Sequence, residues 1–179
     1  MRGSGSDVLD DLRDAVRDVP GFPKPGIIFK DITPLLGDPG LFARATDAMA
    51  QPFATAGVTH VAAIESRGFI LGAPVARRLG AGFIPVRKRG KLPFRTESIE
   101  YALEYGTDHL EVHVDACAKG ARVLVVDDVL ATGGTAEAAC ALLERVGARV
   151  VGCAFLLGLA ALRGEDRLAG RDVRILLNF

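Results

Sequence analysis

Two adjacent acidic residues, Asp127 and Asp128, stand at the end of a strongly apolar run. The run, residues 122–126, is rich in β-branched residues, a pattern typical of a strand buried on both faces of a parallel sheet. A buried carboxylate is unfavourable unless it is paired or hydrogen-bonded, so two of them at the mouth of such a strand indicate a ligand. A sugar diol suits them, because hydroxyl groups donate hydrogen bonds and ionised carboxylates only accept them.

A turn of small residues follows the two acids and opens a predicted helix. It consists of Ala131, Thr132, Gly133, Gly134 and Thr135. Few side chains obstruct it, so its backbone N–H groups can approach a phosphate, and the positive end of the helix dipole adds to the attraction. We therefore expect a sugar phosphate, with its diol on the acids and its phosphate on the turn. The alternative is an ordinary strand–turn–helix unit in which Asp128 caps a backbone group.

A second polar turn follows another apolar run, residues 58–64, and reads Glu65-Ser66-Arg67-Gly68. The carboxyl ends of parallel strands share one edge of a sheet, so this turn is expected on the same edge as the two aspartates. The planar guanidinium of Arg67 suits a diphosphate, which it can bind in a bidentate way. The alternative is that Arg67 only pairs with Glu65.

Four cations, Arg87, Lys88, Arg89 and Lys91, occur within five positions after a third predicted strand, residues 82–86. A short basic run is usually a solvated surface or a nucleic-acid contact. Lys and Arg total 22, as do Asp and Glu, and no aromatic residues are interleaved with the cations, so we expect no nucleic-acid partner. A diphosphate group bound with Mg²⁺ needs positive charge of this kind.

The first 34 residues are expected to form a helix and then an irregular segment. The helix begins near Ser6 or Asp7, has an apolar face that reaches Val19, and is ended by Pro20. Residues 21–34 are apolar but proline-rich, so no regular element is expected there. They are either a loop packed on the core or a rigid apolar hood over a flat ligand.

Residues 91–106 form a long polar excursion between predicted sheet elements. Connections of this length in compact domains are usually binding loops or lids, so we expect a mobile lid that excludes water during the reaction. The segment contains Glu104 and Tyr105. The alternative is that Glu104 is a surface acid in a hairpin.

The 179 residues are expected to form one domain. Further along the chain the pattern predicts a strand over 149–157, a helix over 159–168 and a last strand over 173–177. No apolar run reaches membrane-spanning length and the N-terminus lacks a signal-peptide core, so we expect a cytoplasmic protein without a membrane partner. Of the three cysteines, Cys140 and Cys153 lie in apolar stretches and are expected to be buried thiols.

The segment 123–135 resembles the phosphoribosyl-diphosphate (PRPP) signature of the type I phosphoribosyltransferases. Segments 22–34, 65–69, 87–93 and 103–106 resemble those of the family members that act on adenine, in the same order and spacing. The resemblance implies an α/β fold with a twisted, mostly parallel central sheet flanked by helices. It also implies an N-terminal hood, formed with the first helix by residues 6–34, and a flexible catalytic loop.

The resemblance also implies roles for individual residues and for partners. The catalytic residues would be Glu104, Tyr105 and Arg67. The PRPP or AMP site would comprise Asp127, Asp128, Ala131, Thr132, Gly133, Gly134, Thr135, Ser66, Arg67, Arg87, Lys88 and Lys91. The base site would comprise Ile28, Phe29, Lys30 and Leu159. Mg²⁺ would be carried by PRPP or diphosphate without a direct protein ligand, the bond between Glu65 and Ser66 would be cis, and a homodimer would bring basic residues near the partner's site.

The implied reaction converts adenine and PRPP to AMP and diphosphate, as in purine salvage. Gly158 and Glu165 depart from the family pattern, which has a glutamate and an arginine at these positions. Transfer to another purine base therefore stays an alternative. A regulator that senses PRPP without turning it over is a second alternative, although no extra helical domain or basic face is evident for it.

Overall fold

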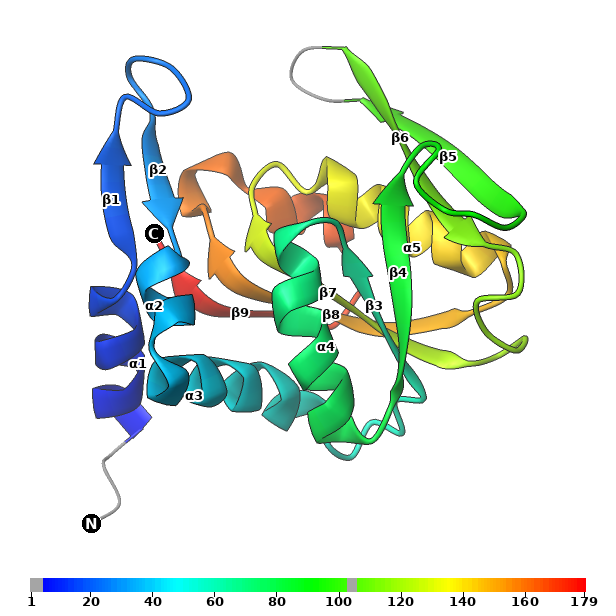
Figure 1. Cartoon of the computed structure of the whole chain (residues 1–179), viewed down its shortest axis with the longest axis horizontal. Helices are drawn as coiled ribbons and strands as arrows, with labels where there is room; N and C mark the ends of the chain where they lie inside the picture. Colours follow the sequence, from blue (N-terminus) through cyan, green and yellow to red (C-terminus); the bar gives the residue numbers. More distant parts are fainter. Residues whose placement is uncertain (1–4, 103–105) are drawn as a thin grey trace. The chain divides into compact units, whose positions relative to one another are not determined.

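The structure is a computed structural model that describes residues 5–102 and 106–179, with side chains described from residue 9 onward. The chain forms two compact units, Met1–Ala48 and Met49–Phe179 (Figure 1).

The first unit contains a helix and a β-hairpin. Helix α1 (Gly5–Asp14) is followed by strands β1 (Arg17–Pro20) and β2 (Ile28–Asp31), which pair antiparallel. Helix α2 (Thr33–Gly37) comes next, and α3 (Pro39–Ala50) begins in this unit with Asp38 Oδ1 accepting hydrogen bonds from two of its first backbone N–H groups.

The hairpin corrects two sequence predictions. The first helix ends at Asp14 and does not continue to Pro20, and Ile28–Asp31 is a regular strand within the segment expected to be irregular. The physical reason is the placement of the prolines: Pro20 is the last residue of its strand and the next two lie in the connecting loop, so the ladder keeps its N–H donors. Ion pairs between Arg17 and Asp31 and between Lys30 and Asp18, both 2.6 Å, link the two strands.

The second unit is built on a mixed sheet of seven strands. Their spatial order is β5 (Thr96–Ala102), β6 (Thr107–His113), β4 (Gly82–Lys88), β3 (His60–Ile64), β7 (Arg122–Leu130), β8 (Arg149–Gly158) and β9 (Val173–Asn178). The strands from β4 to β9 in this order pair in parallel, and β6 pairs antiparallel with both β4 and β5. The predicted twisted, mostly parallel α/β sheet is confirmed.

Two helices cover opposite faces of this sheet. Helix α4 (Arg67–Leu79) packs on β3 so closely that a Cβ atom at Gly72 would lie 2.5 Å from Cβ of Ala63. Helix α5 (Gly134–Arg145) packs on the other face, where its buried side chains join a cluster that includes Ala62, the residue before Ala63. Successive residues of a strand point to opposite faces, so the two helices sandwich the sheet (Figure 1).

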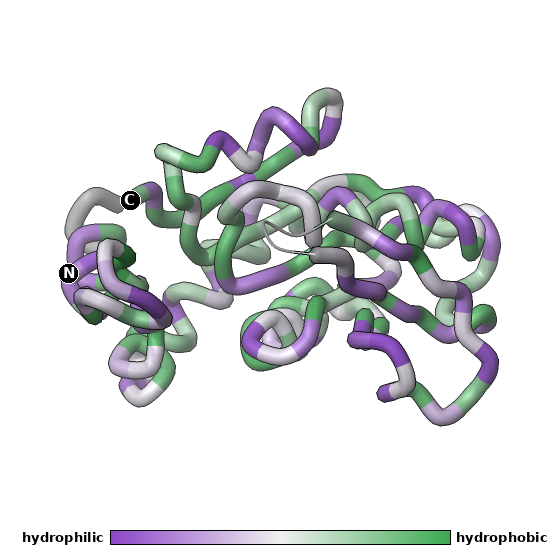
Figure 2. Tube along the Cα trace, turned by 90° about the horizontal axis from the view of Figure 1, so that it is seen from above, coloured by the Kyte–Doolittle hydropathy of each residue, from purple (hydrophilic) through white to green (hydrophobic). Residues whose placement is uncertain are grey.

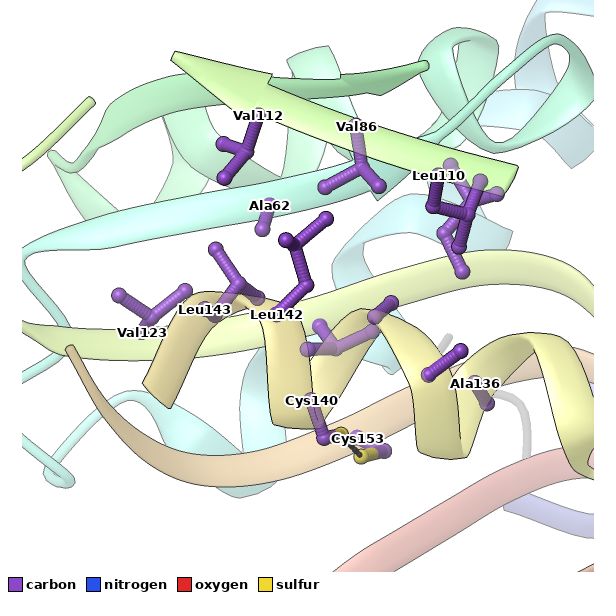
Figure 3. Packing of buried hydrophobic residues seen from close by; sticks show 14 of the residues in the cluster. Ala62, Val86, Leu110, Val112, Val123, Ala136, Cys140, Leu142, Leu143 and Cys153 are labelled. Atoms are coloured by element: carbon purple, nitrogen blue, oxygen red, sulfur yellow. Dashed lines mark hydrogen bonds between the residues drawn. The ribbon is translucent and has the colours of Figure 1, made fainter. Parts of the chain in front are cut away.

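The core under α5 is a cluster of buried, mainly aliphatic side chains. Leu142 and Leu143 are completely buried and point from the helix toward Val86 and Ala62 on the strands (Figure 3). Cys140 of α5 and Cys153 of β8 are also buried, with their sulfur atoms 3.6 Å apart. The expectation of two buried thiols is therefore confirmed.

Two connecting segments differ from the sequence predictions. Within the segment 91–106, residues Thr96–Ala102 form strand β5, paired along its whole length with β6. Cross-strand pairing stabilises this polar strand, which sequence hydrophobicity did not indicate. The helix expected over 159–168 is instead two 3₁₀ turns, Ala160–Leu162 and Gly164–Leu168, because Arg163 between them has a left-handed backbone with φ of 50°.

Hydrophobic and hydrophilic residues are interspersed along the trace (Figure 2). Within the described part of the chain, no helix combines the length and the hydropathy needed to cross a membrane.

The packing of α5 gives a stability prediction. Leu142→Ala removes a completely buried side chain and leaves a cavity, so it should lower the free energy of unfolding by about 2–5 kcal/mol. Leu162→Ala is the matched control, because Leu162 is 42% exposed and its loss should change stability by about 0.5 kcal/mol or less. Urea unfolding followed by circular dichroism measures both, and equal effects would contradict the assigned packing.

Candidate functional site

A pocket of about 350 Å³ opens at the carboxyl ends of β3, β4 and β7. This is the edge at which open α/β sheets bind ligands. Its lining comes from four strands, from the starts of helices α4 and α5, and from the turns before these helices: Ile64, Glu65, Ser66, Arg67, Lys88, Tyr101, Asp127, Asp128, Val129, Leu130, Ala131, Thr132, Gly133, Thr135 and Ala136. Most of its polar members are residues predicted from the sequence to lie at this edge.

Asp127 and Asp128 lie in β7 itself, which continues to Leu130 and so extends beyond the acids. Asp128 is only 6% exposed and accepts a hydrogen bond from Nε of Arg67. Oδ1 of Asp127 accepts the backbone N–H of Asp128 at 2.9 Å. Withdrawal from water, and then the negative charge of Asp128, raise the pKa of Asp127 well above its ordinary value.

Gly68 lets the start of α4 approach the two acids. A Cβ atom at this position would lie 2.7 Å from Oδ1 of Asp127 and 3.2 Å from the carbonyl oxygen of Val126. Any larger residue would push the helix away from β7. The absence of a side chain is therefore what brings Arg67, the first residue of α4, within reach of Asp128.

The turn before α4 contains a cis peptide bond between Glu65 and Ser66, as expected from the family resemblance. The alternative pairing of Arg67 with Glu65 is not the contact found. Glu65 instead accepts a hydrogen bond from Nε of Arg87 at 2.7 Å, while Arg67 contacts Asp128.

The small-residue turn lies directly beside the acids and leads into α5. Gly133 has a left-handed backbone with φ of 84°, and a Cβ atom there would collide with the carbonyl oxygen of Gly164. Thr132, Gly133 and Thr135 line the pocket, where N–H groups at the start of α5 can attract an anion. Gly134, which is the first residue of α5, is not part of the lining.

Lys88 is the member of the basic run that lines the pocket. Its ammonium group donates a hydrogen bond to the carboxylate of Asp108 and another to the hydroxyl of Tyr101 at 3.2 Å. Partial burial works against the charged form of Lys88, but these two bonds outweigh it and raise its pKa. The bond from Lys88 also lowers the pKa of Asp108.

Arg87 and Lys91 do not line the pocket, although Arg87 donates a hydrogen bond to the carbonyl oxygen of Lys91 at 3.0 Å. Sequence reasoning missed Tyr101 and Asp108. They are a directly opposed pair in the β5–β6 hairpin, so recognising them required the register of two polar strands.

A second pocket, also of about 350 Å³, lies at the ends of β8 and β9. It contains the predicted base-site residue Leu159 together with Gly158 and Glu165, the two departures from the family pattern. A Cβ atom at Gly158 would lie 2.6 Å from Oδ1 of Asn178 and 2.9 Å from Ile175. A side chain at this position would require Asn178 and Ile175 to move.

The other predicted base-site residues lie on β2 in the first unit. Ile28 is 56% exposed, and Phe29 packs edge-on against Phe22 with the ring centres 5.2 Å apart. The amine of Lys30 contacts Asp18. Glu104 and Tyr105, the predicted proton-transfer residues, lie outside the described residues.

Among the described residues, no group of three or more His, Cys, Asp and Glu side chains forms a metal-binding cluster. Asp127 and Asp128 nevertheless present carboxylate oxygens in the pocket wall. Such hard oxygen donors suit a Mg²⁺ ion that is held mainly by substrate oxygens and water.

Known proteins with similar sequences are phosphoribosyltransferases, which agrees with a pocket suited to a sugar phosphate. The family model described as "Phosphoribosyl transferase domain" matches residues 33–175. An adenine phosphoribosyltransferase of Methylobacterium sp. (strain 4-46) is 58% identical over 167 residues, which cover 93% of this chain and 92% of the relative.

Solved structures show the same similarity. The adenine phosphoribosyltransferase of Rhodothermus marinus superposes with a TM-score of 0.93 and 54% identity, covering 98% of this chain and all of that one. The enzyme of Saccharomyces cerevisiae, complexed with adenine and an imino-altritol bisphosphate, has a TM-score of 0.90 and 36% identity over 96% of this chain and 99% of its own. The chain thus belongs to the phosphoribosyl transferase family and, within it, to the adenine phosphoribosyltransferases.

Proposed function

We propose that the protein transfers the 5-phosphoribosyl group of PRPP to adenine, forming AMP and diphosphate, as in purine salvage. The observation that carries the proposal is the arrangement of the first pocket. Asp127 and Asp128 line it together with the small-residue turn that leads into α5 and with the cations Arg67 and Lys88, and Arg67 contacts Asp128. A phosphorylated sugar with a diol and a second phosphate group matches this set of donors and acceptors.

In the proposed mechanism the protein supplies positioning and electrostatics, not a covalent intermediate. Asp127 and Asp128 accept hydrogen bonds from the ribose hydroxyls. As the bond to the leaving group breaks, the sugar ring gains positive charge beside these two carboxylates. That charge favours the ionised form of Asp127, whose pKa is raised in the free protein.

The two phosphate ends of PRPP would bind different parts of the site. Ala131, Thr132, Gly133, Gly134 and Thr135 hold the 5′-phosphate at the start of α5. Ser66, Arg67 and Lys88, which line the pocket, serve the diphosphate together with Arg87 and Lys91, which are close to Lys88 in the chain but outside the lining. Mg²⁺ would be carried by the diphosphate oxygens and would neutralise part of the leaving group's charge, and Asp127 and Asp128 of the same pocket lining would serve as acceptors for its waters.

As the family resemblance implies, Ile28, Phe29, Lys30 and Leu159 are proposed to bind the base, residues 6–34 to form the hood, and residues 1–179 to act as one phosphoribosyltransferase domain. The adenine complex of the yeast relative supports the choice of base. Residues 91–106 would act as a mobile lid. Glu104, assisted by Tyr105, would handle the proton on the five-membered ring of the purine.

We further propose a cytoplasmic homodimer. Ile70 of α4 and Phe83 of β4 are large apolar residues that are 44% and 38% exposed, and Phe83 packs edge-on against Phe69 with ring centres 5.7 Å apart. Exposed apolar area on a small domain often marks a protein interface, and a second copy of the chain would cover it.

The first experiment measures diphosphate release with PRPP and Mg²⁺ and one base at a time: adenine, hypoxanthine, guanine, xanthine or orotate. Turnover with adenine alone is expected. Turnover with a different base would keep the PRPP site and reject the adenine specificity. Binding of PRPP without turnover of any base would reject the enzyme and favour a PRPP sensor.

Asp128→Ala should weaken PRPP binding by at least about tenfold, because it removes an acceptor for the sugar diol and a partner of Arg67. Isothermal titration with PRPP and Mg²⁺ measures the effect. Asp115→Ala, which removes an exposed acid beyond β6, is the charge-matched control. Unchanged PRPP affinity in a folded Asp128→Ala protein would contradict the proposed diol site.

Glu104→Ala should lower kcat by roughly 10²–10⁴, the usual loss for a general acid–base group, with little change in PRPP affinity. Steady-state kinetics and PRPP titration separate the two effects. Glu100→Ala removes an exposed acid on the preceding strand and should leave kcat near the wild-type value. Normal turnover of Glu104→Ala would remove this residue from the mechanism.

A further inference from the structure

The hairpin formed by β5 and β6 is attached to the pocket wall at Lys88. Tyr101 of β5 and Asp108 of β6 face each other across the hairpin, and both accept hydrogen bonds from the Lys88 ammonium group. Tyr101 is 9% exposed and its ring also lies 5.7 Å from the Lys88 nitrogen. Lys88 is therefore held on one side by two groups from a single cross-strand pair.

The main chain around Lys88 is fixed to the same hairpin. Strand β4 pairs with β6 through Arg87 opposite Glu111 and Lys88 opposite Leu110. Glu111 is 8% exposed and accepts the backbone N–H of Gly90 at 2.9 Å, in the turn after β4. Strand β6 thus contacts both the backbone of Lys88, through the strand pairing, and its side chain, through Asp108.

The hydrogen-bonding capacity of Lys88 decides what this arrangement can do. A lysine ammonium group has three N–H donors, and the bonds to Asp108 and Tyr101 use two of them. Lys88 and Tyr101 line the first pocket, whereas Asp108 does not. The remaining N–H donor can bind a ligand in the pocket while the Lys88 ammonium group keeps its hydrogen bond to Asp108 outside the lining.

We infer that Asp108 and Tyr101 are positioning residues, which hold the Lys88 ammonium group in place for the diphosphate end of PRPP. The inference rests on the proposed function. A lysine side chain has four flexible torsions, and holding it before the ligand arrives removes part of the entropy cost of binding. Neither residue needs to touch the substrate.

Charge and positioning predict opposite effects for Asp108→Asn. If charge alone mattered, neutralising the carboxylate would leave the positive charge of Lys88 without its negative partner, and the anionic diphosphate and PRPP would bind more tightly. If Asp108 positions Lys88, its loss frees the side chain and weakens binding. The direction of the change in PRPP affinity therefore separates the two accounts.

The test uses the full-length protein with Mg²⁺. Asp108→Asn should raise the KM for PRPP and the inhibition constant of diphosphate about tenfold, as for a lost charge-assisted hydrogen bond, and leave the KM for adenine unchanged. Tyr101→Phe removes only the hydroxyl and should raise both constants about threefold. Glu100→Gln is the matched control, because Glu100 pairs with His109 next to the Tyr101–Asp108 pair and should leave both constants unchanged.

A double-mutant cycle tests whether Asp108 affects PRPP binding through Lys88. In a Lys88→Met background, Asp108→Asn should have no further effect on the KM for PRPP, since the group it positions is gone. An additional tenfold loss there, or a wild-type or lower KM in Asp108→Asn alone, would overturn the inference.

Titration of diphosphate and Mg²⁺ into the same variants keeps this test independent of turnover. If the wild-type protein turns over no base, the proposed function fails, and diphosphate affinity still decides the role of Asp108. If the wild-type protein is active and Asp108→Asn binds diphosphate normally, the positioning role fails and the proposed function stands.

Discussion

Parallel pairing of β3 with β4 on one side and with β7 on the other is the constraint on which the site depends. Ile64 lies opposite Val86, and Ala63 lies opposite Val126, so the residues that follow these pairs on the three strands lie at nearly the same level. The residues that follow are the turn from Glu65 to Arg67, then Lys88, and the pair Asp127–Asp128, and all of them lie at one edge of the sheet. Reversing any of these strands would send its functional groups to the far side of the sheet.

Cations at this edge are matched by carboxylates from neighbouring elements. Arg67 contacts Asp128, Arg87 contacts Glu65 and Lys88 contacts Asp108. An anionic ligand thus meets cations that are already oriented. Recognition then depends on the positions of the donors more than on overall attraction, as a chain with 22 cationic and 22 anionic residues requires.

The polar residues that follow buried strands could be predicted from the sequence. Contacts that depend on how two strands are aligned with each other could not. The acids at 127–128 and the turn at 65–68 follow apolar runs whose burial is evident from composition. The N-terminal hairpin was missed because its prolines lie at a strand end and in the loop, where they leave the ladder intact. Strand β5 was missed because its residues are only partly buried, and without its register Tyr101 and Asp108 could not be matched to Lys88.

The close approach of Gly133 and Gly164 has a consequence for the two pockets. Gly133 lines the first pocket and Gly164 the second, and each would collide with the other's segment if it carried a Cβ atom. Leu130 contributes to both cavities. At this point the backbone of residues 131–133 lies directly against the backbone of Gly164, with the side chains of Leu130 and Arg167 beside them. A change that widens one cavity at Gly133 or Gly164 therefore has to move backbone that also lines the other cavity.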